Sequence, residues 1–239
     1  MEIDKGRKGR AVTFLKQAAK EKEISLVYSR KEILKNQLGY MDKTMWILQV
    51  ALYFLAALLV ARLYALGTER EGVLAVVAMM AGAVGIVSMM GICHAFYSDM
   101  AELSGSCYFN VSQMTMFQLV YYGTLNLGGM FAGIFFLGFG WQIPFVQISL
   151  YVLVPFLFTQ CCALGAALTK AGRKSPGLAC LVGAFAAISC GAAASFPAVY
   201  RTSALAFWEI AFGVEVAAFG WQIKRLFHML GEGEILCMN

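Results

Sequence analysis

Six long apolar runs, separated by polar breaks, dominate the pattern of hydrophobic and polar positions along this chain. Each run has roughly the twenty residues that an α-helix needs to cross the hydrocarbon core of a bilayer. Soluble helices rarely stay apolar over that length, so the pattern predicts an all-α, polytopic membrane protein with six transmembrane helices. The runs are Met45–Leu66, Gly72–Ala95, Met114–Leu137, Ile143–Leu168, Gly177–Phe196 and Ser203–Ile223.

Composition supports this class and suggests the division of the chain. Of its 239 residues, 60% are hydrophobic and 14% are charged, which is too apolar for an ordinary soluble domain. We expect a basic amphipathic cytosolic arm over residues 1–44, a six-helix transmembrane domain over residues 45–229 with a cytosolic loop at 95–113, and a cytosolic tail at 230–239. The first apolar run then serves as both insertion signal and first span.

The positive charges predict the orientation in the membrane. Eleven of the nineteen Lys and Arg residues precede the first run, and sixteen in all fall on the side of the two termini. Only Arg62, Arg70 and Arg201 fall on the other side. Because cytoplasmic segments carry an excess of Lys and Arg, both termini are expected in the cytosol of a multi-pass cell-membrane protein.

The N-terminal arm has the pattern of an amphipathic helix. Val12, Leu15 and Ala18 recur at helical spacing among Lys16 and Lys20. A basic amphipathic helix directly before a span commonly lies in the headgroup layer. Two interpretations stay open: an orientation anchor that holds anionic membrane lipids, and a docking arm for a cytosolic partner.

The break between the second and third runs, His94–Phe117, is expected in the cytosol although it carries no Lys or Arg. It is far longer than a reversal of direction requires. It contains Asp99 and Glu102, then a small flexible stretch, then Tyr108 and Phe109 ahead of the third run. A solvated loop with a short helix on the membrane surface would explain it, and so would a partner-docking segment formed by these four residues.

Part of this break resembles a known family. Glu102–Gln113, followed by Gln118–Gly123, resembles the intracellular stretch of ABC-2-type exporter permeases. The six-span plan with both termini inside and a basic helix before the first span is similar too. The resemblance implies a coupling helix that lies against a cytosolic ATPase subunit. The chain is also similar to six-span membrane proteins of Gram-positive bacteria, in which an arm like Glu32–Tyr40 precedes a Trp-bearing first span.

Two carboxylates lie inside the sixth run, Glu209 and Glu215. A charged side chain at the bilayer centre costs about 3 kcal/mol on insertion scales, so such residues usually face a bundle interior or a water-filled path. Six residues place them about 120° apart around a helix, so they do not form one paired site. A proton or cation relay, a polar contact for a transported headgroup, and an interhelical hydrogen bond all remain open. Gln147 and Gln160 of the fourth run are the best candidates to line a path beside Glu215.

Small residues predict close helix packing in the third run. Gly129-x-x-x-Gly133 is a pattern that lets two helices approach closely, within one chain or against a second copy. A homo- or heterodimer is therefore expected. The seven cysteines show no metal-ligand spacing and are interpreted as packing residues.

Several function classes lack their sequence signatures. The chain has no Walker motif, no dinucleotide-binding glycine motif and no HExxH. We therefore expect no enzyme activity, no cofactor, no metal and no nucleic-acid partner. Two hypotheses follow: a permease subunit of a bacterial ABC-type exporter that dimerises and works with a separate cytosolic ATPase, or a membrane-embedded regulator or assembly factor that recruits a cytosolic partner without transport.

Overall fold

The computed structural model describes residues 43–97, 111–141, 144–200 and 204–231, and all regular structure in these ranges is helical. Five helices are long and apolar enough to span a membrane, which confirms the all-α class and supports a membrane location. They are α3 (Lys43–Ala65), α4 (Arg70–Tyr97), α6 (Val111–Trp141), α7 (Phe145–Ala167) and α9 (Pro176–Ala194). A short helix α8 (Lys170–Lys174) and a 3-10 turn η1 (Pro197–Tyr200) flank α9.

The last long helix, α10 (Leu205–Gly231), differs from these five. Its 27 residues are enough to cross a bilayer, but it carries Glu209, Glu215 and Gln222 among its apolar residues. By apolarity it is not one of the five span candidates. The predicted sixth run therefore forms a helix whose composition alone does not make it a span.

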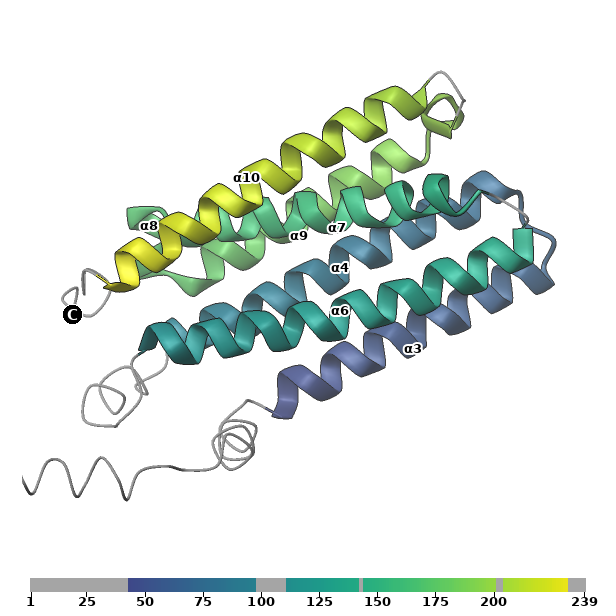
Figure 1. Cartoon of the computed structure of the whole chain (residues 1–239). Coiled ribbons are helices and arrows are strands. Elements are labelled where there is room, and N and C mark those ends of the chain that lie inside the picture. The colour runs from purple at the N-terminus through teal and green to yellow at the C-terminus, as the bar shows by residue number, and fades with distance from the viewer. Residues whose placement is uncertain (1–42, 98–110, 142–143, 201–203, 232–239) are drawn as a thin grey trace, which may run out of the picture. The chain divides into compact units, whose positions relative to one another are not determined.

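The helices alternate in direction and lie side by side (Figure 1). Because Trp46 stacks on Tyr121 and Tyr53 bonds Asn126, α3 and α6 run the same way. In the same manner α10 runs parallel to α7, since Trp208 contacts Tyr151 near the start of both helices. We call the end of the bundle where α3 begins and α10 finishes the basic end, because Lys43, Lys170, Lys224 and Arg225 lie there.

Helices α4 and α7 occupy the centre: α4 packs against α3, α6, α7 and α9, and α7 packs against α4, α6, α9 and α10. Small residues allow the close approach of α4 to α9. A Cβ on Gly82 would lie 3.0 Å from the Cβ of Ala187, and one on Gly183 would lie 3.2 Å from Ile86. Larger side chains at these glycines would push the two helices apart.

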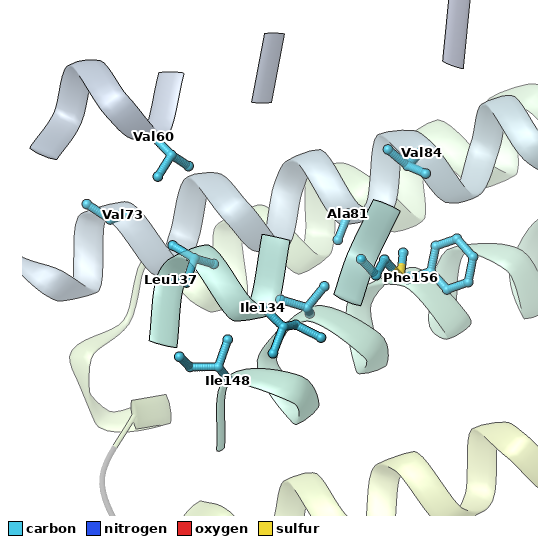
Figure 2. Close-up of a cluster of buried hydrophobic side chains, with 10 residues drawn as sticks. Val60, Val73, Ala81, Val84, Ile134, Leu137, Ile148 and Phe156 are labelled. Carbon is cyan, nitrogen blue, oxygen red and sulfur yellow. The ribbon is translucent and has the colours of Figure 1, made fainter. Parts of the chain in front are cut away.

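Buried apolar side chains from α3, α4, α6 and α7 form the main core cluster, which Figure 2 shows. The outer faces of α3 and α6 are apolar too, with large side chains such as Leu58 and Phe131 exposed. Such faces suit lipid rather than water. The core cluster comprises Val60, Val73, Ala81, Val84, Met130, Ile134, Leu137, Ile148, Val152 and Phe156.

A Schellman motif closes the α3–α4 hairpin. Gly67 takes a left-handed conformation with φ of 66°. The Gly67 amide donates to the Tyr64 carbonyl, and the Thr68 amide donates to the Leu63 carbonyl. These bonds satisfy carbonyls that the last turn of α3 would otherwise leave unpaired.

Candidate functional site

Polar groups at the contact between α7 and α10 form the candidate site, which we call the Glu215 seam and define as Cys161, Glu215 and Gln222. Glu215 lies half-buried on the face of α10 that packs against the bundle. The Cys161 thiol donates to the backbone carbonyl of Glu215 at 3.6 Å, and the side-chain amide of Gln222 donates to the backbone carbonyl of Cys161 at 3.1 Å. Glycine at position 165 leaves room for the Gln222 side chain, 3.1 Å from where a Cβ would be.

Two oxygens of this seam are buried without a hydrogen-bond donor among the described residues: Glu215 Oε2 and Gln222 Oε1. Unpaired buried acceptors are costly, and more so in a low-dielectric interior. Two further thiols, Cys162 of α7 and Cys190 of α9, lie within electrostatic range of the Glu215 carboxylate. The seam therefore offers acceptors to a ligand that is cationic or that donates hydrogen bonds.

The seam does not have the form of a metal centre. Within the described ranges, no group of three or more His, Cys, Asp or Glu side chains is placed to hold a metal ion. Cys161, Cys162 and Cys190 are free thiols. Its chemistry is that of one carboxyl group, one amide and neighbouring thiols.

Glu209 has a different environment from Glu215. It lies in the second turn of α10 and is exposed, about 9 Å along the helix axis from Glu215. The two carboxylates thus lie on different faces of one helix, as their six-residue separation predicts. They provide a natural pair for comparison, with the same residue type on the same helix but only one of them packed against α7.

The two glutamines predicted to line a path have their own neighbours. The Gln147 amide donates to the hydroxyl of Tyr151 one turn along α7, at 2.8 Å. Gln160 is buried, with its Cγ 3.5 Å from where a Cβ on Gly85 of α4 would lie. Cys161 of α7 is instead the residue that bonds to the Glu215 turn of α10, and Gln222 of α10 bonds to Cys161. Gln222 was recognisable from sequence, because seven residues place it on the same face of α10 as Glu215.

A second polar cluster, the amide network, joins α3, α4 and α6 and comprises Gln49, Tyr53, Ser88 and Asn126. The Gln49 amide donates to Ser88 Oγ at 3.1 Å and to Asn126 Oδ1. The Asn126 amide donates to Ser88 Oγ at 2.8 Å, and the Tyr53 hydroxyl donates to Asn126 Oδ1 at 3.1 Å. Gln49 and Ser88 are fully buried, so this network replaces water with interhelical bonds.

The predicted glycine pair divides between two environments. A Cβ on Gly129 would lie 2.5 Å from Cζ of the Tyr53 ring, so this glycine makes room for the tyrosine that bonds Asn126. A Cβ on Gly133 would meet nothing within 4 Å, and Gly133 is exposed. Gly129 therefore serves packing inside the chain, whereas Gly133 lies on the outer face of α6.

An aromatic cluster fastens the α9–α10 connection at the end opposite to the basic end. The Tyr151 ring meets Tyr200 and Trp208 edge-on, with centroid distances of 5.1 and 5.2 Å. The Tyr200 hydroxyl donates to the Ala194 carbonyl at 2.7 Å, and Trp208 Nε1 donates to the Val199 carbonyl at 3.0 Å. These polar groups are satisfied within the chain, so we interpret the cluster as a structural contact that holds the α9–α10 connection in place.

The four residues predicted to dock a partner, Asp99, Glu102, Tyr108 and Phe109, lie outside the described residues. So do the arm before Lys43 and the tail after Gly231. Their role stays a prediction from sequence.

Comparison of the chain with models of protein families, with curated proteins and with solved structures finds no match. Function is therefore inferred from the chain's own residues and from their geometry in the helix bundle.

Proposed function

We propose that this chain is the membrane-spanning permease subunit of a bacterial ABC-type exporter, which works with a separate cytosolic ATPase and dimerises. In this proposal α10 is the sixth crossing and both termini are cytosolic. Its support is that α10 runs antiparallel to α9 and alongside α7, as a sixth crossing would. The basic side chains gathered at one end of the bundle agree with the charge bias of a cytosolic side.

The observation that carries the proposal is the Glu215 seam. A carboxyl group at this depth costs about 3 kcal/mol on insertion scales, and here one of its oxygens also lacks a donor. A passive anchor gains nothing from such a group. A transporter does, because a bound substrate with a positive charge or a hydrogen-bond donor would satisfy Glu215 Oε2 and Gln222 Oε1.

The packing provides a route from an ATPase to the seam. The segment between α4 and α6, which holds Asp99, Glu102, Tyr108 and Phe109, would dock the ATPase. Movement of that segment would displace α4, which packs directly against α7. Because α7 in turn forms the seam with α10, displacement of α4 would change the surroundings of Glu215.

The first experiment is affinity purification of the tagged full-length chain from its native cell in mild detergent. We expect a cytosolic ATPase in stoichiometric amount, and we expect Glu102→Lys to reduce its recovery. Glu69→Lys is the matched control, since Glu69 is an exposed carboxylate at the opposite end of the bundle. Absence of any ATPase, or equal loss with both variants, would contradict the exporter assignment.

The second experiment tests the seam with a lipophilic cation, tetraphenylphosphonium, and the purified full-length protein. Tetraphenylphosphonium has no hydrogen-bond donor, so its attraction to Glu215 is that of an ion pair, roughly 3 kcal/mol for opposite charges about 5 Å apart at an effective dielectric constant of about 20. Glu215→Gln is therefore expected to weaken binding by at least about tenfold. Glu209→Gln removes the same charge from the exposed face of α10 and should leave binding unchanged. Equal affinities of wild type and Glu215→Gln would exclude the seam as the binding site.

A second candidate function is the membrane-embedded regulator or assembly factor. The observation that favours it is the tight contact of α4 with α9 through Gly82 and Gly183, together with the amide network, whose bonds join α3, α4 and α6. Both hold the helices in one arrangement, as a static scaffold would require. This candidate predicts a stoichiometric partner without ATPase motifs, and a Glu215→Gln variant that binds and functions as wild type.

A further inference from the structure

The last turns of α10 carry an exposed cationic and aromatic surface, which we call the Trp221 cluster and define as Trp221, Lys224 and Arg225. All three side chains are exposed, and the Trp221 side chain has 63% of its surface free. The Arg225 guanidinium carbon lies 5.9 Å from the centroid of the Trp221 ring. This contact holds the two side chains together at one position on the surface.

The charges around the Trp221 cluster are uniformly positive among the described residues. Lys170 is exposed at the start of α8, which lies at the same end of the bundle as the last turns of α10 (Figure 1). The described carboxylates are elsewhere: Glu69, Glu71 and Glu209 lie near the opposite end, and Glu215 lies in the middle of α10. The surface therefore attracts anions, and no described acidic side chain at this end neutralises it.

The same helix provides an apolar surface directly before the cluster. Ile210 and Val214 are exposed on the same face of α10 as Trp221, with 67% and 63% of their surfaces free. Trp is enriched at the boundary between hydrocarbon and headgroups, where its ring is apolar and its N–H can reach polar groups. Along one helix the chain thus presents, in order, a surface for acyl chains, an interfacial ring and two cations.

We propose that the Trp221 cluster binds an anionic phospholipid in the membrane leaflet at the basic end of the bundle. Lys224 and Arg225 bind the phosphate, Trp221 lies at the level of the glycerol, and the acyl chains run along Ile210 and Val214. An acidic protein surface would satisfy the two cations but would leave the exposed apolar side chains and the ring without a partner. This lipid site is independent of the ATPase and of the Glu215 seam, and so it goes beyond the proposed function.

The test is a lipid titration of the full-length protein in detergent, followed by native mass spectrometry. Dioleoyl phosphatidylglycerol is the anionic probe and dioleoyl phosphatidylcholine the zwitterionic one. Each basic side chain near an anionic lipid surface strengthens binding about fivefold, so the double variant Lys224→Gln/Arg225→Gln should lose about 25-fold in apparent affinity for phosphatidylglycerol. Because both side chains are exposed, its melting temperature should stay close to that of wild type.

The matched control is Arg62→Gln/Arg70→Gln, which changes the net charge equally at the opposite end of the bundle. It should bind phosphatidylglycerol as wild type does. An equal loss in both double variants would reveal a general effect of net charge and overturn the proposal. Equal affinity of wild type for the two lipids would also overturn it, as would a Lys224→Gln/Arg225→Gln variant that binds lipid normally but loses an acidic protein partner.

Discussion

The amide network makes the sharpest prediction about stability. Asn126→Leu keeps the branched shape of the side chain and removes its carbonyl and amide groups. In the wild type, this side chain bonds Gln49 of α3, Tyr53 of α3 and Ser88 of α4. The substitution therefore breaks three interhelical contacts and leaves Gln49, which is fully buried, with Ser88 as its remaining partner in the network.

The size of the effect follows from these three bonds. Interhelical polar contacts in membrane proteins contribute about 0.6 kcal/mol on average and up to about 1.7 kcal/mol. Three of them give roughly 2 kcal/mol at the average value, and the partly orphaned Gln49 amide moves the result upward. We expect Asn126→Leu to lower the free energy of unfolding by about 2–3 kcal/mol.

The assay is equilibrium unfolding in mixed micelles of dodecyl maltoside and sodium dodecyl sulfate, followed by circular dichroism. Thr124→Val on the same helix is the matched control. Thr124 is exposed, and its hydroxyl donates to the Val120 carbonyl of its own helix at 2.7 Å. Because no interhelical bond is lost, Thr124→Val should stay within about 0.5 kcal/mol of wild type.

A double-mutant cycle separates the network from local packing. In Gln49→Leu/Asn126→Leu both partners of one bond become apolar, so neither amide is left without the other. The double variant should be more stable than the sum of the single effects predicts, by at least about 0.5 kcal/mol. If Asn126→Leu unfolds like Thr124→Val, or if the single effects simply add, the network does not hold the helices together as inferred.

Two further predictions compare matched residues. Gly129→Ala should destabilise the bundle by about 1–3 kcal/mol, because its Cβ would overlap the Tyr53 ring. Gly133→Ala should be neutral or stabilise α6 by up to about 1 kcal/mol, because a Cβ there meets no neighbour. Equal unfolding midpoints of the two variants would refute this prediction. Trp208→Phe should lower the free energy of unfolding by about 1 kcal/mol, because the hydrogen bond to the Val199 carbonyl is lost. Trp221→Phe should have little effect, because Trp221 is exposed. The same micelle titration measures both variants, and an unchanged stability of Trp208→Phe would contradict the structural role of the aromatic cluster.

The sequence by itself was sufficient to predict an all-α fold built from long apolar helices. Helices that cross a bilayer must be long and apolar and must satisfy their backbone groups internally. Composition and the length of the apolar runs reveal both properties directly from the sequence. All six predicted runs coincide with long helices, and five are confirmed as apolar enough to span. The helical period also placed Glu209 and Glu215 on different faces of α10, because that angle depends only on their separation along the chain.

Only the tertiary structure decided which polar residues meet. Gln49, Ser88 and Asn126 come from three helices, and nothing in the spacing along one helix reveals a partner on another. Gly129 and Gly133 are equivalent in sequence, yet one accommodates the Tyr53 ring and the other faces outward, because the rotation of α6 about its axis is set by its neighbours. Cys161 lies in the Glu215 seam for the same physical reason. Helix geometry fixes the angles between the side chains of one helix, and the packing of the helices decides which neighbours those side chains contact.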